Sequence, residues 1–453
     1  MNNSLFLLLF SLLIIGLACE NKSNKPAVIT GNKTEKLSDE ALLTLVQEKT
    51  FQYFWSGAEP NSGMARERIH MDGHYPQDDK NVVASGGSGF GVMAIVVGIE
   101  RGFITRAAGV DRLLKIMNFL KKADRFHGAW PHWMHGESGK TKPFSKKDDG
   151  GDIVETSYMA QGLLCVRQYF KDGGEREKRL AAVADTLWRE IEWDWYRGPD
   201  QENVLFWHWS PNYGWEMNFR ITGYNECLIT YVLAASSQKC AIRAESYHDG
   251  WGKGGGISGG PARYDYHLAL KHNGAPQYGR PLFWAHYSFL GLDPRNLSDR
   301  YANYWEHNKN HVLINRQYCI ENPNNFKGYG EEAWGLTSSY SPKGYAGHSP
   351  GRDLGVIAPT AALSSMPYAP KEVMKVIRHF YEDLGDRLMG PYGFYDAYSE
   401  QENWFPQKYL AIDQGPIVVM IENYRTGLLW DLFMSAAEVK AGLDKLGFNY
   451  KAP

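Results

Sequence analysis

Helical patterning over almost the whole chain constrains the fold more than any other feature of the sequence. From about residue 37 onward, apolar residues recur at the spacing of helices that are buried on one side or all round. Alternation of the strand kind is scarce, and Val204–Trp209 is the best short candidate for a strand. The pattern predicts these helices: Ser38–Trp55, Gly91–Arg101, Arg106–Lys122, Ile153–Phe170, Arg176–Trp195, Tyr224–Ser236, Phe283–Leu290, Ser298–Cys319, Pro359–Ser365, Lys371–Leu388 and Pro416–Leu443.

Many of these stretches come in pairs that are joined by long loops rich in glycine and aromatic residues. About twelve helices without a break in composition predict an all-α protein built as an (α/α)6 toroid. The inner helices of a toroid are apolar almost all round, as Ile153–Phe170 and Ile417–Phe433 are. The loops on one rim must then carry the site. An open α-solenoid is the structural alternative.

The first 19 residues resemble a bacterial lipoprotein signal peptide. Leu5–Leu17 is an apolar run too short to span a bilayer, and small residues directly precede Cys19, which we expect to carry the lipid. Residues 20–36 are polar and predict a flexible tether, and residues 37–453 a single catalytic domain. We expect an exported, lipid-anchored monomer in the periplasm or at the outer membrane. An ordinary signal peptide cut elsewhere is the alternative.

Composition narrows the class of ligand. The formal net charge of −2 gives no reason to expect a nucleic acid as partner. Aromatic residues make up 14% of the chain, and their flat apolar faces with polar edges suit sugar rings, although large helical proteins also use them to fill the core. The spacings of Cys165, Cys227, Cys240 and Cys319 match no metal or redox motif, which favours free thiols.

Four carboxylates gather at one predicted helix start, in the segment from Lys147 to Glu155. Asp152 is a good N-cap, and Glu155 three residues later fits a capping box. Capping does not explain Asp148 and Asp149, for which contacts with sugar hydroxyls are one interpretation. Calcium binding is another, although the spacing fits no EF-hand loop.

Two further acids are candidates for catalysis. Glu226 enters an apolar helix, where desolvation would raise the pKa of its carboxyl group and keep it protonated as a general acid. An exposed glutamate on the first turn is the alternative. Asp413 stands among apolar residues just before Pro416, and Glu422 is the competing acid on the same element. Aromatic residues expected to form a rim around these acids are Trp130, Trp133, Trp334, Tyr345, Trp404 and Tyr409.

Several other chemistries lack their motifs. The sequence has no Walker loop, no Gly-x-Ser-x-Gly elbow and no HExxH, and His132 and His135 have no apparent third ligand, so we expect no metal. Two separated carboxylates, one acting as acid and one as base, are the simplest set of catalytic groups that the sequence contains. Glycoside hydrolases use such a pair.

Three segments resemble a known family. They are Ser85–Gly91 leading to Ile99–Gly102, Asp149–Thr156 and Ile357–Leu363. Together they are similar to the Bacteroidetes family known as "putative glucoamylases", whose characterised members are endo-β-1,2-glucanases. The resemblance runs from about residue 37 to 445.

The resemblance implies an (α/α)6 toroid that hydrolyses β-1,2-glucan with inversion at the anomeric carbon and needs no metal or organic cofactor. By motif match, Glu226 would be the general acid and Asp413 the general base or a close supporter of it. The residues implied to bind sugar are Asp148, Asp152 and Glu155, joined by the rim residues Trp130, Trp334, Tyr345 and Trp404.

Other functions remain open at this level. The family also contains exo-acting members that release sophorose. A polysaccharide lyase on a similar toroid would use Tyr or His as base with Arg, and Arg263, Tyr264, Tyr266 and His267 are candidates for those roles. A non-catalytic sugar-binding lipoprotein would need the aromatic rim but no acid–base pair. An α-glucan hydrolase is the remaining option.

Overall fold

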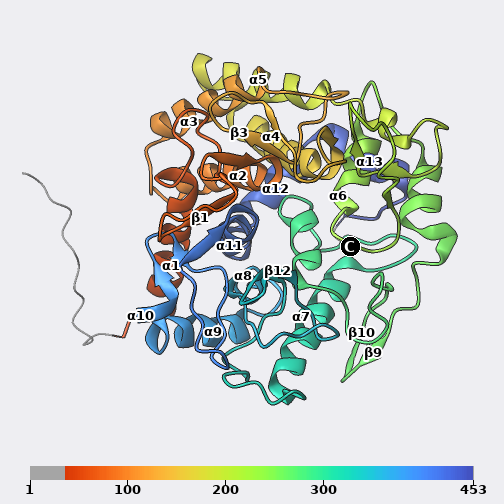
Figure 1. Cartoon of the computed structure of the whole chain (residues 1–453). Coiled ribbons are helices and arrows are strands. Elements are labelled where there is room, and N and C mark those ends of the chain that lie inside the picture. The colour runs from red at the N-terminus through yellow and green to blue at the C-terminus, as the bar shows by residue number, and fades with distance from the viewer. Residues whose placement is uncertain (1–35, 452–453) are drawn as a thin grey trace, which may run out of the picture. The chain divides into compact units, whose positions relative to one another are not determined.

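The computed structural model describes residues 36–451 and is mainly helical, which confirms the predicted class (Figure 1). The signal peptide, the lipidated Cys19 and the tether up to residue 35 lie outside the described residues. The α-helices are α1 Asp39–Trp55, α2 Ser85–Glu100, α3 Arg106–Leu120, α4 Ile153–Phe170, α5 Glu175–Arg189, α6 Leu228–Ser236, α7 Tyr304–Glu321, α8 Pro359–Leu363, α9 Pro370–Glu382, α10 Gly385–Leu388, α11 Ala411–Arg425, α12 Leu428–Met434 and α13 Ala437–Leu446.

An inner set of apolar helices forms the core. Helices α2, α4 and α11 lie toward the middle of the view in Figure 1, where α2 contacts both of the others, and α4 also contacts α6. The crossing of α2 and α4 is close because glycines face it. A Cβ atom at Gly89 would lie 2.4 Å from the Tyr158 carbonyl oxygen, and one at Gly162 would lie 2.4 Å from the Gly89 carbonyl oxygen. Any larger residue at either position would therefore force these helices apart.

An outer set of helices packs against the inner one through a single apolar face. Helix α5 contacts α4, α3 contacts α2, α13 contacts α6 and α9 contacts α8. In α9 the buried residues are Val373, Val376, Ile377 and Phe380, a spacing that places them on one face. Most of the other residues of the helix are polar and at least partly exposed.

The predicted helices exist, but several boundaries differ. The stretch Phe283–Leu290 forms two short 3₁₀ turns, Leu282–Ala285 and Tyr287–Phe289. Pro416–Leu443 is split into α11, α12 and α13, and the first of these breaks falls at Gly427, which adopts a left-handed conformation with φ of 76°. Helix α11 also begins at Ala411, so Pro416 lies inside the helix rather than in its first turn.

Short antiparallel strands lie in the loops and fix the residues near the site. They are β1 Arg68–His70, β2 Val82–Ala84, β3 Trp133–His135, β4 Thr141–Lys142, β5 Gly151–Asp152, β6 Leu205–Phe206, β7 His208–Trp209, β8 Arg220–Ile221, β9 Ala262–Arg263, β10 Tyr266–His267, β11 Ser338–Ser341, β12 Gly344–Gly347, β13 Met389–Gly390, β14 Gly393–Phe394 and β15 Lys408–Leu410. The predicted strand Val204–Trp209 is thus two strands, β6 and β7. Strand β7 pairs with β5, β1 with β15, and β2 with β3.

The four cysteines of the described chain are free, as expected, and three of them are buried. In the same part of the chain, none of the helices combines the length and the apolar character that a membrane span needs.

A group of buried histidines predicts that the folded protein loses stability at acidic pH. Burial lowers the pKa of His286 to about 3 and that of His311 to about 4, and it lowers the pKa values of His272 and His307 further below their usual range. The unfolded chain therefore binds more protons than the folded chain below about pH 6.5. The stability from these residues is complete above that pH and is lost as the pH falls toward 4 and then 3.

We expect the urea midpoint of unfolding to fall steadily between pH 6.5 and 4. His311→Asn should reduce this slope, whereas His74→Asn, in an exposed loop, should leave it unchanged. Equal midpoints at pH 7 and pH 4.5 would contradict the assignment.

Candidate active site

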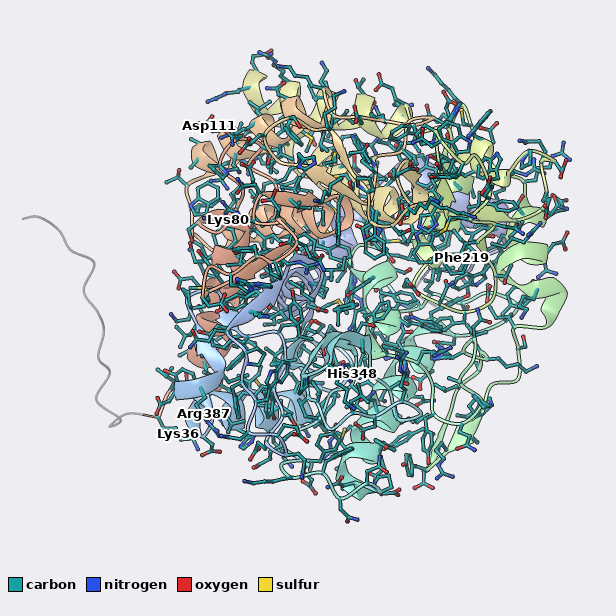
Figure 2. The ribbon with its side chains drawn as sticks, viewed as in Figure 1. Lys36, Lys80, Asp111, Phe219, His348 and Arg387 are labelled. Carbon is teal, nitrogen blue, oxygen red and sulfur yellow. The ribbon has the colours of Figure 1, made fainter. Side chains whose placement is uncertain are left out.

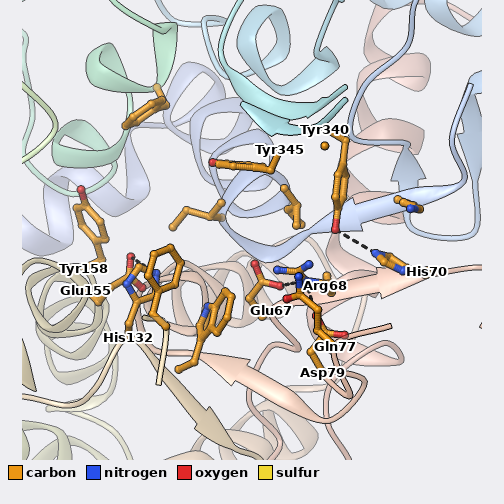
Figure 3. Close-up of a pocket in the computed structure, with 18 of the residues that line it drawn as sticks. Glu67, Arg68, His70, Gln77, Asp79, His132, Glu155, Tyr158, Tyr340 and Tyr345 are labelled. Carbon is orange, nitrogen blue, oxygen red and sulfur yellow. Dashed lines mark hydrogen bonds and ion pairs between the residues drawn. The ribbon is translucent and has the colours of Figure 1, made fainter. Parts of the chain in front are cut away.

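A cavity of about 540 Å³ opens among the loops that carry β1, β3 and β12 and the starts of α4 and α11. Figure 3 shows Glu155, His132 and Tyr158 at one end, and His70, Gln77 and Asp79 at the other. Aromatic side chains form much of its wall, namely Trp133, Phe144, Tyr158, Trp207, Phe283, Tyr287, Tyr340 and Tyr345. The cavity thus combines apolar faces with acids, which suits a ligand rich in both C–H and hydroxyl groups.

Asp148 and Asp152 lie behind His132 rather than in the cavity wall. His132 Nδ1 is 3.1 Å from Asp152 Oδ2, and His208 Nε2 is 3.2 Å from Asp148 Oδ2 and 3.5 Å from Asp152 Oδ2. Although burial opposes it, the two aspartates raise the pKa of His208 to about 9. The charge of Glu155, followed by Asp148 and Asp152, raises the pKa of His132 well above its usual range against the effect of burial. We infer a cluster of two carboxylates and two imidazolium groups, of which His132 faces the cavity.

Asp152 also caps α4, as the sequence predicts. Its Oδ1 accepts the backbone N–H groups of Val154 and Glu155, both at 2.9 Å, and its Oδ2 accepts the indole N–H of Trp207 at 3.1 Å. The capping box, however, does not form. Glu155 Oε2 accepts the backbone N–H of Gly86 at 2.7 Å instead, because α2 starts beside α4.

Glu155 is the one of these three predicted sugar-binding acids that lines the cavity. Burial is the main cause that raises its pKa to about 7, and the neighbouring carboxylate of Asp152 raises it further against the opposing charge of His132. The distance from Glu155 Oε1 to His132 Nε2 is 3.9 Å. Glu155 therefore titrates near neutral pH inside the cavity.

Glu226 lines the same cavity. It lies in the turn before α6 rather than on the helix, because the Asn225 side chain accepts the Cys227 backbone N–H at 2.9 Å. Its side chain is half-buried and protein surrounds it on most sides. Burial raises the pKa of Glu226 to about 7, and the charge of Glu155 adds to the rise. This is the desolvated acid that the sequence predicts.

Asp413 lies directly behind the wall, in the first turn of α11. Its Oδ1 accepts the hydroxyl of Tyr287 at 3.4 Å, and Tyr287 lines the cavity. Asp413 interacts with Asp396, and because both carboxyl groups are buried we infer that the pair holds one proton and one negative charge. Burial and the Asp396 charge raise the pKa of Asp413, and burial raises that of Asp396 to about 6.

Glu422, the competing acid, is part of the framework. It accepts hydrogen bonds from Arg101 Nε at 2.6 Å and Arg101 Nη2 at 2.9 Å, and from Gln47 at 3.2 Å. It does not line the cavity. These contacts connect α11 to α1 and to the end of α2, so Glu422 has a structural role outside the cavity.

The predicted aromatic rim is only partly correct. Tyr345 and Trp133 line the cavity, but Trp130 and Trp334 are fully buried core residues, and Trp404 and Tyr409 do not contact the cavity either. The indole N–H of Trp130 donates to the Leu120 carbonyl at 3.2 Å, so the polar edge of this buried ring is already paired within the protein. Phe219, which is labelled in Figure 2, is 51% exposed and stacks on Trp207, a residue of the cavity wall.

Residues that the sequence analysis missed include Glu67, Arg68, Asp79, Tyr287 and Tyr340, which all line the cavity. Tyr287 stands in a 3₁₀ turn and the other four in short strands and loops, where no local signal marks a residue as part of a site. The lyase candidates Arg263, Tyr264, Tyr266 and His267 lie on the β9–β10 hairpin, outside the lining of the cavity.

One group in the described chain has the spacing of metal ligands. Ligand atoms of His132, Asp148 and Asp152 all lie within 4.8 Å of one another. Ion pairs of His132 and His208 with the two aspartates join the members of this group.

Comparison with known proteins gives consistent relatives. The Glycoamylase family, described as "Putative glucoamylase", matches residues 218–437. An endo-β-1,2-glucanase from Chitinophaga pinensis, solved as a complex with sophorotriose and glucose, is 64% identical, with 92% of this chain and 99% of that chain covered and a TM-score of 0.91. A "putative glucoamylase" from Bacteroides caccae is 58% identical, with 91% and 100% covered and a TM-score of 0.90.

A third relative is longer. The exo β-1,2-glucooligosaccharide sophorohydrolase (non-reducing end) of Parabacteroides distasonis is 45% identical over 446 residues, which are 94% of this chain and 60% of that protein. The chain therefore spans about 60% of the length of this curated relative.

The helical fold, the acid-lined cavity and these relatives together define a glycoside hydrolase. The chain belongs to the "putative glucoamylase" family, among whose close structural homologues are endo-β-1,2-glucanases.

Proposed function

We propose that this protein hydrolyses β-1,2-glucan in the cavity between Glu155 and Tyr340. The observation that carries the proposal is Glu226, a carboxyl group in an aromatic cavity with its pKa raised to about 7. The substrate is supported by the names of the Chitinophaga and Parabacteroides relatives, both of which act on β-1,2-linked glucans.

Glu226 acts as the general acid and Asp413 supports the base. Glu226 gives its proton to the glycosidic oxygen as the bond to the anomeric carbon breaks, while a water molecule attacks the opposite face and inverts that carbon. The water loses its proton toward Asp413. Because Asp413 lies behind Tyr287, this proton passes through a hydroxyl group, either that of Tyr287 or one of the substrate. The proton shared with Asp396 leaves this pair one negative charge with which to accept it.

Endo cleavage is the finer proposal, with sophorose and short β-1,2-gluco-oligosaccharides as products. It is supported by higher identity, over almost the full length, to the endo-acting Chitinophaga enzyme than to the exo-acting relative. The helix pairs are proposed to close as an (α/α)6 toroid. The apolar run before Cys19 supports export and lipid anchoring, with the enzyme acting as a monomer.

A substrate panel tests the proposal. The protein is incubated with linear β-1,2-glucan, starch and a uronate polysaccharide, and products are separated by chromatography over time. We expect sophorose and short β-1,2 oligomers from the first substrate only, with intermediate lengths appearing early. Glucose oligomers from starch, or products with a new double bond, would refute the substrate and the reaction class respectively.

The pH profile should show an alkaline limb. Glu226 must be protonated to act as an acid, so kcat/KM should fall about tenfold per unit well above pH 7. On the acid side, kcat/KM should fall below about pH 6, because protonation of the Asp413–Asp396 pair removes its negative charge. Glu155→Gln removes a negative charge that raises the pKa of Glu226, so the activity that this variant retains should begin to fall at a lower pH than in the wild-type protein. If the activity begins to fall at the same pH or at a higher one, Glu226 is not the titrating acid.

A further inference from the structure

The end of the cavity away from Glu155 holds a charged cluster that the proposed chemistry does not use. Arg68 in β1 lies between two carboxylates, pairing with Glu67 and lying with its Nε 3.2 Å from Asp79 Oδ2 (Figure 3). All three line the cavity, and Gln77 does so beside them. Although burial opposes it, the neighbouring charge of Glu67 raises the pKa of Arg68, so the guanidinium stays charged.

Asp79 has unused hydrogen-bonding capacity in this cluster. It is only 2% exposed, yet neither of its carboxylate oxygens accepts a hydrogen bond from the described protein. The contact with Arg68 is an ion pair without hydrogen-bond geometry. Because a buried acceptor without a donor is costly, a ligand that offers hydroxyl groups here gains the hydrogen bonds that the protein leaves unmade.

The wall around Asp79 is fixed before any ligand arrives. The ring of Tyr75 stacks on His70 with centroids 4.9 Å apart, and the Tyr75 hydroxyl accepts the His70 backbone N–H at 2.9 Å. His70 Nδ1 lies 2.7 Å from the His74 carbonyl oxygen, and its Nε2 lies 3.0 Å from the Tyr340 hydroxyl. These contacts hold the 71–80 loop against β1 and β11, and little ordering remains to be done on binding.

The charges of the cluster indicate which ligand fits. The carboxylates of Glu67 and Asp79 disfavour an anion, and the guanidinium of Arg68 with the Lys408 ammonium in the same cavity wall disfavours a cation. A neutral ligand whose groups both donate and accept hydrogen bonds suits the mixture. Glucose units joined through their 2-positions keep free hydroxyls on neighbouring carbons 3 and 4, and such a pair matches one carboxylate.

We propose that Asp79, Arg68 and Gln77 form a glucosyl-binding subsite that holds the β-1,2-glucan chain away from the bond that is cleaved. This inference rests on the proposed function, because it places the subsite in the same cavity. The subsite contributes only to chains long enough to reach from Glu226 to Asp79, and it therefore sets the preference for chain length.

Binding measured without turnover tests the subsite. Calorimetry in a Glu226→Gln background follows the Kd of β-1,2-gluco-oligosaccharides from two to six units. We expect Asp79→Ala and Gln77→Ala to weaken the longest oligosaccharide about tenfold and to leave the disaccharide unchanged. Gln77 is exposed, so its truncation does not threaten folding. Gln407→Ala, at a nearby exposed residue outside the cavity lining, is the matched control and should change nothing.

The outcomes separate the two proposals. If wild-type protein hydrolyses β-1,2-glucan but neither variant alters the dependence of Kd on length, the subsite is wrong and the function stands. If the wild-type protein leaves β-1,2-glucan intact and no oligosaccharide binds the Glu226→Gln protein, both are wrong. If Asp79→Ala does not fold, a loss of affinity in Gln77→Ala that is confined to the longer oligosaccharides still supports the subsite.

Discussion

Replacing Glu226 with glutamine should lower kcat on β-1,2-glucan by about 10²–10⁴-fold, the usual contribution of a general acid. Glutamine keeps the size of the side chain and can still hydrogen-bond a sugar, but it has no proton to give to the departing oxygen. The half-buried position and the raised pKa of Glu226 are the physical reasons for this role. Rates are measured as the release of reducing ends, and binding by calorimetry with sophorotriose, which should change little.

Glu332→Gln makes the same chemical change at an exposed loop residue outside the cavity lining and is the matched control. It should keep full activity. If Glu226→Gln lowers kcat by less than tenfold, the general acid is instead Glu155, the other carboxyl group in the cavity with its pKa raised to about 7.

The second large effect is expected on stability. Asp152→Ala removes the cap of α4, leaves His208 with one carboxylate instead of two and leaves His132 with two instead of three. Loss of a buried ion-pair partner typically costs about 3–5 kcal/mol, and loss of a cap about 1 kcal/mol. We therefore expect the free energy of unfolding, measured in urea at pH 7, to fall by several kcal/mol. Activity should fall as well, because His132 lines the cavity.

Asp152→Asn separates the two contributions. Asparagine caps helices about as well as aspartate but carries no charge, so this variant should lose the ion-pair part alone. It should be more stable than Asp152→Ala by about 1 kcal/mol. A cost below about 1 kcal/mol for the alanine variant would show that the cluster of two aspartates and two histidines contributes nothing to stability.

The sequence predicted the helices better than the turns between them. Periodicity marks α4 and α9 because burial follows one face or the whole surface of a continuous helix. The start of α6 was placed too early, since the apolar run does not reveal that Asn225 closes a turn around Glu226. The break at Gly427 was also missed, although a glycine there is the local signal for a helix end.

The site was predictable where a single residue carries its own signal. Glu226 stands out as an acid among apolar neighbours, and Asp152 as a residue at a helix start. Glu67 and Asp79 carry no such signal. Glu67 is placed beside the site because β1 pairs with β15, where Arg68 lies opposite Leu410, and Asp79 because the loop after β1 returns to Arg68. Composition equally fails to separate Trp130 in the core from Trp133 in the cavity, since both are tryptophans only three residues apart in the sequence.

The most direct test of the account is proton NMR during the first minutes of β-1,2-glucan hydrolysis. An inverting reaction at Glu226 releases new reducing ends in the α configuration, which then equilibrate slowly with the β form. We predict early α-anomer signals with wild-type protein and none with Glu226→Gln. Early β-anomer signals would show retention and contradict the mechanism, and no new reducing ends at all would contradict the function.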